Sequence, residues 1–75
     1  MPKTPRITAQ KLVRALKRAG FVEDHQTGSH LILVQPRTGR MAVVPMHHGV
    51  LPVGLVHDIL EQAGLTLEDL IRLLD

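Results

Sequence analysis

The stretch Gly28-Ser29-His30-Leu31-Ile32-Leu33-Val34 decides how the middle of this 75-residue chain folds. Gly28 and Ser29 favour a turn, and a run of four apolar residues follows His30 and stops shortly before Pro36. An apolar run that is this short and lies between breaker residues is typical of a buried central strand. His30 is the first residue of that strand. Because the neighbouring strands fix the backbone there, the imidazole would be presented to a ligand in a defined position. On single-residue evidence, a structural role for such a histidine is more frequent than a catalytic one.

Two more strands are expected beside this one. The pattern predicts strands at residues 21–25, 30–35 and 41–46, joined by a turn at 26–29 and a hairpin loop at 36–40. With the connections centred in this way, antiparallel pairing sets His30 opposite His25 on one side and opposite Met46 on the other. The imidazoles of His25, His30 and the His47-His48 pair would then gather at one end of the sheet.

Both faces of the predicted sheet are apolar. Strand alternation assigns to one face Phe21, Ile32, Val34, Ala42, Val44 and Met46, and to the other Val22, Leu31, Leu33, Met41 and Val43. If helices cover only one of these faces, the remaining face needs a partner chain.

A first helix is expected from the N-cap Thr8 to about residue 19, with Gly20 as its stop. Its apolar side at helical spacing consists of Leu12, Val13, Leu16 and Ala19. Lys11, Arg14 and Arg18 line up on another side, as a phosphate-facing row or as an ordinary solvated face.

The chain after residue 50 is expected to form two helices. Pro52 suits the start of the first and Gly64 its end, and the apolar side consists of Leu55, Val56, Ile59, Leu60 and Ala63. Thr66 and Asp69 predict a capping box for a short last helix. A DNA-reading helix-turn-helix is disfavoured here, because Glu68 and Asp69 would repel a phosphate backbone.

These elements predict a single α+β domain over residues 1–75, in the order α-β-β-β-α with an additional short C-terminal helix and a three-stranded antiparallel sheet. Residues 1–6, with two prolines, are expected to form a flexible tail. A chain of this length buries only a marginal core, so a homodimer or a hetero-oligomer would help to stabilise it.

Composition excludes several classes of protein. Phe21 is the only aromatic residue, which argues against base-stacking platforms, and the absence of cysteine excludes disulfides and thiolate metal sites. With no signal peptide and no bilayer-spanning apolar segment in the sequence, a soluble cytoplasmic protein is expected. The net charge of +2 is unevenly distributed, +6 over residues 1–40 and −4 over residues 41–75, so the first part is the one suited to a polyanion.

The order helix, three strands, helix is that of a double-stranded-RNA-binding domain, and the residues resemble the HicA toxins (YcfA-like) of bacterial toxin–antitoxin pairs. Three pieces carry the resemblance: Arg18-Ala-Gly-Phe21, Gly28-Ser29-His30, and Val44-Pro45-Met-His47 followed by Leu51, Gly54 and Ile59-Leu60-Glu-Gln62-Ala63-Gly64-Leu65. Together they span nearly the whole chain in the family's order.

The resemblance implies an mRNA interferase, an endoribonuclease that a HicB-type antitoxin neutralises, with His30 as the catalytic histidine. The chain departs from the family after the third strand, where basic residues are frequent in relatives but Asp58 and Glu61 stand here. Binding of RNA would therefore rest on the first half of the chain.

Histidine suits metal-independent RNA cleavage, in which the 2′-hydroxyl attacks phosphorus, so His30 is expected to act as general acid or base. Ser29, His47 and His48 are auxiliary candidates, although Ser29 also suits a plain turn, and the sequence does not decide between the two histidines. The expected RNA-binding residues are Lys11, Arg14, Arg18, Arg37 and Arg40. No metal ion and no cofactor is expected.

Three alternatives stay open. A noncatalytic double-stranded-RNA-binding module would keep the basic helix and not need His30. A metal-binding protein would use His25, His30 and His47, although no well-placed carboxylate or cysteine joins them. A purely structural partner would use only the spare apolar face and the acidic last helix.

Overall fold

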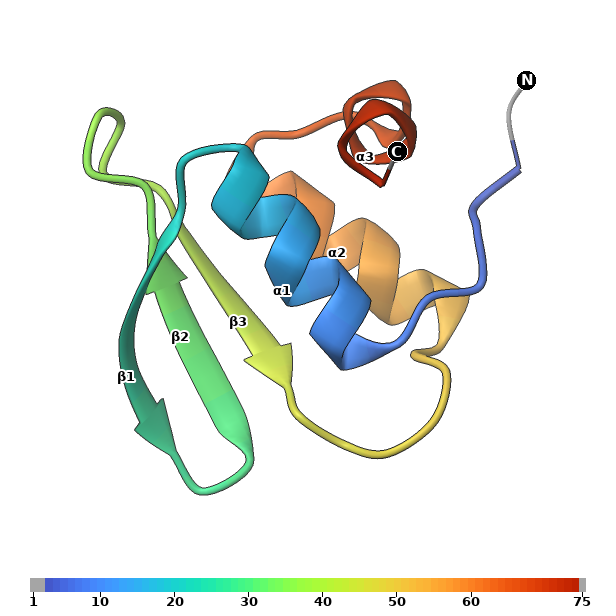
Figure 1. Cartoon of the computed structure of the whole chain (residues 1–75), viewed down its shortest axis with the longest axis horizontal. Helices are drawn as coiled ribbons and strands as arrows, with labels where there is room; N and C mark the ends of the chain where they lie inside the picture. Colours follow the sequence, from blue (N-terminus) through green and yellow to red (C-terminus); the bar gives the residue numbers. More distant parts are fainter. Residues whose placement is uncertain (1–2, 75) are drawn as a thin grey trace.

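The computed structural model describes residues 3–74 and places three helices and three strands in the predicted order (Figure 1). The elements are α1 (Ala9–Arg18), β1 (Val22–Thr27), β2 (His30–Val34), β3 (Met41–Pro45), α2 (Val53–Ala63) and α3 (Leu67–Leu73). The α+β class, the three-stranded antiparallel sheet and the additional short helix are therefore confirmed.

Local capping signals set the helix ends. The Thr8 hydroxyl accepts a hydrogen bond from the Lys11 backbone N–H at 3.3 Å and starts α1. Gly64 ends α2 with φ 72°, in the left-handed region that favours glycine. Thr66 and Asp69 form the predicted capping box of α3, each side chain accepting from the other's backbone N–H.

The sheet has the order β1-β2-β3, so β2 is the central strand (Figure 1). Only Gly28 and Ser29 separate β1 from β2, with Gly28 at φ 58°. A glycine with positive φ at the first position of a two-residue hairpin loop is typical of a type II′ turn. This turn extends β1 two residues beyond the prediction, and Asp24 becomes the extra residue of a β-bulge.

The predicted pairing of His30 is wrong on both sides. His30 lies opposite Thr27 of β1 and Pro45 of β3, not opposite His25 and Met46. The tight Gly28-Ser29 turn moves the first pairing by two residues. On the other side the hydrogen bond from the Gln35 N–H to the Arg40 carbonyl, at 2.8 Å, closes a shorter loop and moves the pairing by one.

Because of that one-residue shift, the predicted division of the two sheet faces is also wrong. Leu31 pairs with Val44 and Leu33 with Ala42, and these four side chains lie in the core beneath the helices. Val22, Ile32, Val34, Met41 and Val43 belong to the opposite face. The core is otherwise built from α1, α2, Leu70 of α3 and the loop residues Ile7 and Leu51, and Phe21 is its single ring.

In the part of the chain that the structure describes, all three helices lie on one side of the sheet (Figure 1). The other side is bare, and on it Val22 and Met41 are 52% and 50% exposed. Among residues 3–74 no helix is both long and apolar enough to cross a membrane.

The predicted tail, residues 1–6, lies partly outside the described residues, since Met1 and Pro2 are not among them. Further along, the Thr4 hydroxyl and Nε2 of His57 on α2 share a hydrogen bond of 2.6 Å. Ile7 is buried, and its carbonyl accepts from the Leu51 N–H at 2.8 Å. The segment before α1 is thus attached to the loop before α2 and to α2 itself.

We expect Leu33→Ala to lower the free energy of unfolding by about 2–5 kcal/mol, because Leu33 is fully buried in the centre of the core. Val53→Ala, at a half-exposed position of α2, is the control and should change it by less than about 0.5 kcal/mol. Urea denaturation followed by circular dichroism measures both. Equal losses for the two variants would contradict this assignment of the core.

Hydrogen bonds from the Thr66 backbone and side chain, and then from Arg72, hold the pKa of Asp69 below its ordinary value. A carboxyl whose pKa is lower in the folded state stabilises it fully above the unfolded pKa of about 3.9. That contribution is lost as the pH falls through the folded pKa. We therefore expect Asp69→Asn to flatten the fall of the melting temperature in acid. Glu68→Gln removes a neighbouring charge of the same helix turn and is the control; its melting temperature should fall in acid as that of the wild type does. Equal profiles for the two variants would refute the role of the capping box.

Candidate functional site

His30 lies at the rim of the sheet, at the first position of β2. Its backbone is paired with neighbouring strands on both sides, while its side chain is exposed. Alternation along β2 puts His30 on the same face as Ile32, whereas Leu31 and Leu33 point towards the helices. A rigid strand therefore presents this imidazole on the bare side of the sheet.

Ser29 and the His47-His48 pair lie at the same end of the sheet as His30. The Ser29 carbonyl accepts a hydrogen bond of 2.6 Å from the Met46 N–H, which extends the β2–β3 pairing one step beyond β3. His47 is the next residue, so the turn before His30 and the start of the His47-His48 segment are neighbours. Both histidines are exposed and lie outside β3, so strand alternation no longer selects one of them.

His25 does not join this group in the way the sequence suggested. It lies opposite Ile32, and its Nδ1 pairs with the Asp24 carboxylate at 2.6 Å. Diagonal positions on one sheet face are roughly 7–8 Å apart, so His25 shares the face of His30 without being its direct neighbour.

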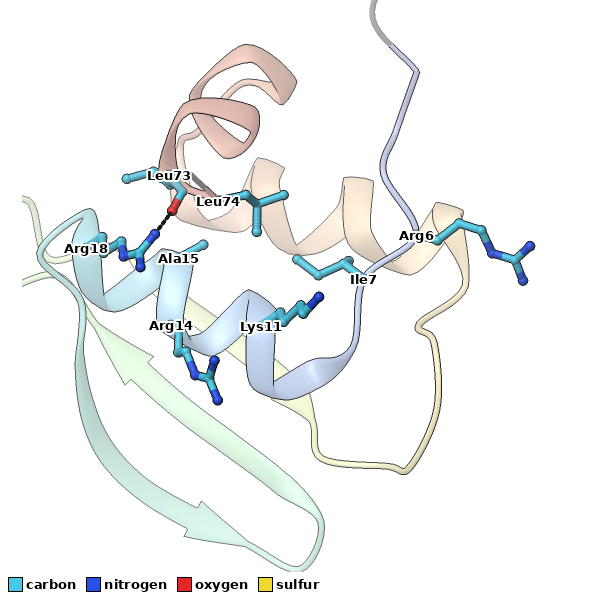
Figure 2. A pocket seen from close by; sticks show the side chains of 8 residues that line it. All are labelled: Arg6, Ile7, Lys11, Arg14, Ala15, Arg18, Leu73 and Leu74. Carbon is cyan, nitrogen blue, oxygen red and sulfur yellow. Dashed lines mark hydrogen bonds between the residues drawn. The ribbon is translucent and has the colours of Figure 1, made fainter.

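The row of cations on α1 is present, and its members have different surroundings. Lys11 and Arg14 are exposed along the helix. Arg18 turns towards α3 and donates from Nη1 to the Leu73 carbonyl at 2.6 Å (Figure 2). On the flank facing β1, Lys17 forms an ion pair with Glu23. All three members of the row are exposed, and Arg18 is the one that is held by the end of α3.

A cleft of about 200 Å³ opens between α1, the segment before it and the end of α3. Its lining combines four cationic side chains with four apolar residues: Arg6, Lys11, Arg14 and Arg18, with Ile7, Ala15, Leu73 and Leu74 (Figure 2). Arg6 was missed in the sequence because it was assigned to the tail. The sequence feature that indicates its place is Ile7, because an apolar residue directly before the N-cap predicts that this segment packs against the fold.

Arg37 and Arg40 lie at the other end of the sheet, in the loop between β2 and β3. The five-residue strand β2 separates them from His30 by roughly 13 Å. The Arg40 side chain lies over Gly64 and shares a shallow hollow with Asp58, Glu61 and Gln62. The structure therefore does not bring these two arginines together with His30.

The metal-binding alternative has no geometric support within residues 3–74, since no three His, Asp or Glu side chains there are grouped so that they could hold a metal ion. What the described side chains offer is an exposed imidazole on one side of the sheet and exposed cations on the other. A single ligand that contacts both has to pass around the rim of the sheet. Such an arrangement suits an extended polyanion better than a small molecule.

A comparison with protein-family models matches residues 9–65 to the HicA toxin of bacterial toxin–antitoxin systems. No curated protein matches the chain. The matched segment begins with α1, contains the Gly28-Ser29-His30 turn and strand, and ends one residue after the glycine that terminates α2. Since it covers well over half of the 75 residues, the chain belongs to the HicA family of toxins from bacterial toxin–antitoxin systems.

Proposed function

We propose that this toxin is a cytoplasmic endoribonuclease that cleaves mRNA, with His30 as its catalytic residue, and that a HicB-type antitoxin neutralises it. The observation that carries the proposal is the setting of His30 in a member of this family. The imidazole is exposed at the rim of a central strand, and the residues that the structure describes offer its ring no hydrogen-bond partner. It is therefore accessible to the proton of a bound substrate.

RNA supplies its own nucleophile for this reaction. A base removes the proton of the 2′-hydroxyl, the oxygen attacks the adjacent phosphorus, and the bond from phosphorus to the 5′ oxygen breaks. The departing oxygen takes a proton from an acid, and nearby cations stabilise the charge on the phosphoryl oxygens. Histidine titrates near neutral pH, so His30 suits either proton role.

The second proton carrier is assigned to the His47-His48 segment, which is attached to the Ser29 turn through the hydrogen bond from Met46. Ser29 itself is half-buried in a two-residue loop, which supports the role of a turn former rather than a proton carrier. Lys11 and Arg14 are proposed to hold the RNA backbone through charge.

We expect His30→Ala to reduce the cleavage rate by about 10²–10⁴-fold, the usual contribution of a positioned acid or base. Induced expression in bacteria, with growth and message integrity followed by primer extension, measures the effect. The control is His25→Ala, another exposed histidine of the same face, which should cleave as the wild type does. Circular dichroism establishes that both variants are folded.

Cleavage by the folded His30→Ala variant at the wild-type rate would refute the catalytic assignment. Growth arrest without cleavage by the wild type would indicate the noncatalytic RNA-binding module of the same fold instead.

The bare sheet face supports the proposal of a protein partner. Exposed apolar side chains on one face of a small protein mark an interaction site. Val22 and Met41 are exposed at one end of this face, and His30 lies at its other end, about 13 Å away along β2. An antitoxin that covers the full length of this face would also cover the imidazole. The α1 cations lie on the helical side, so covering them as well would require the partner to reach around the rim.

We expect Met41→Glu to weaken neutralisation by the antitoxin, because it places a charge on the bare apolar face without touching the core. Val53→Glu, a half-exposed position at the start of α2, is the matched control and should be neutralised normally. Growth rescue and co-purification after co-expression of a HicB-type antitoxin measure both. A complex that leaves His30 and Met41 fully exposed would refute this interface.

A further inference from the structure

Helix α3 lies beyond the segment that matches the family, because the match ends at Leu65 and the helix begins at Leu67. It is nevertheless firmly packed: Leu70 is buried in the common core, and Leu73 and Leu74 are half-buried against it. The bond from Arg18 to the Leu73 carbonyl attaches the end of α3 to α1. This helix therefore forms a wall beside the row of cations on α1 (Figure 2).

The cations around the cleft lie in a row and do not converge on one point (Figure 2). Lys11 and Arg18 are seven residues apart on α1, which corresponds to about 10 Å along the helix axis. Arg6 extends the row, its guanidinium pointing away from Arg18 (Figure 2). No carboxylate is among the described residues that line the cleft. A row of this kind suits the successive phosphates of a strand better than a single phosphate group.

The other residues that line the cleft between α1 and α3 are aliphatic. A duplex hides the faces of its bases, whereas an unpaired strand exposes them to protein side chains. No aromatic ring is among the described residues that line the cleft, so a base there would contact aliphatic side chains and arginine guanidinium groups instead of an aromatic platform. Ile7 and the two leucines at the end of α3 provide this aliphatic surface in the cleft of about 200 Å³. A rigid duplex lying along α1 would meet the wall that α3 forms.

We propose that the cleft between α1 and α3 binds a single-stranded segment of RNA, with phosphates on Arg6, Lys11 and Arg14 and an unpaired base against Leu73 and Leu74. The proposal rests on the proposed function, since it takes RNA as the substrate. It adds that α3 selects unpaired RNA, which a fold of the double-stranded-RNA-binding type does not by itself imply.

The test uses the full chain and a fluorescent 2′-O-methyl oligoribonucleotide, which lacks the attacking hydroxyl and is therefore bound without cleavage. Fluorescence anisotropy compares an unstructured strand with the blunt duplex of the same sequence. We expect the strand to bind more tightly. Arg14→Ala should reduce the slope of log affinity against log salt by about 0.7, the value for one phosphate contact on a single strand. Arg72→Ala removes the same charge from the outer side of α3 and should keep the slope.

Leu74→Ser tests the apolar wall separately. It should weaken binding of the strand and leave the salt slope unchanged, because it removes apolar surface and no charge. Leu74→Met should restore the affinity, and thermal melting establishes that both variants are folded.

Equal or tighter binding of the duplex would overturn the proposal, as would wild-type affinity in both Arg14→Ala and Leu74→Ser. Variants that bind RNA normally but escape the antitoxin would show that the cleft is a protein contact. Cleavage of natural RNA is measured in parallel. If the wild type cleaves and the cleft variants bind as it does, only the cleft proposal fails. If the wild type binds through the cleft without cleaving, only the proposed function fails.

Discussion

The pairing register of β2 is the constraint on which the rest of this structure depends. Two short connections set it, the Gly28-Ser29 turn and the loop closed between Gln35 and Arg40. Side chains alternate between the faces of a strand, so a slip of one residue would exchange every inward position for an outward one. The register that forms sends two leucines of β2 into the core and leaves His30 at the rim on the open side. The same strand pairing therefore buries the leucines that stabilise the fold and leaves the imidazole of His30 accessible.

The helices give the other side of the domain a surface with exposed cations. Helix α1 uses its buried side to cover the sheet and its exposed side to present cations. Helix α3 packs beside it, and the Arg18 side chain is used to hold the two together. Among the described residues after residue 40, the carboxylates are Asp58, Glu61, Glu68 and Asp69; they lie on α2 and α3, and none of them lines the cleft between α1 and α3. The α1 cations and the carboxylates of α2 thus occupy different parts of the surface, whereas Arg40 shares a hollow with Asp58 and Glu61.

Much of the fold could be predicted because its signals are local. The capping threonines, the glycine that ends α2 and the apolar spacing of the helices act within a few residues of the chain, and all are confirmed. The strand register could not, because it depends on hydrogen bonds that close the loops and on a bulge at Asp24. The sequence correctly placed His30 at the start of a strand and Lys11 and Arg14 on the exposed side of the first helix, while their functional roles stay predictions. It did not show that Arg18 is engaged by α3, that Arg40 lies over Gly64, or that Arg6 belongs to the cleft, because each depends on packing between distant segments.

The bulge at Asp24 has a consequence for how the protein behaves at high concentration. All six residues of β1 are exposed, and this strand forms an outer edge of the sheet, the kind of template on which chains polymerise edge to edge into fibres. A bulge twists such an edge and interrupts its regular ladder of hydrogen bonds. On the opposite edge, the Gln62 side chain accepts the Val43 N–H at 3.3 Å. The domain can therefore present a bare apolar face to a partner while both edges of its sheet resist self-assembly.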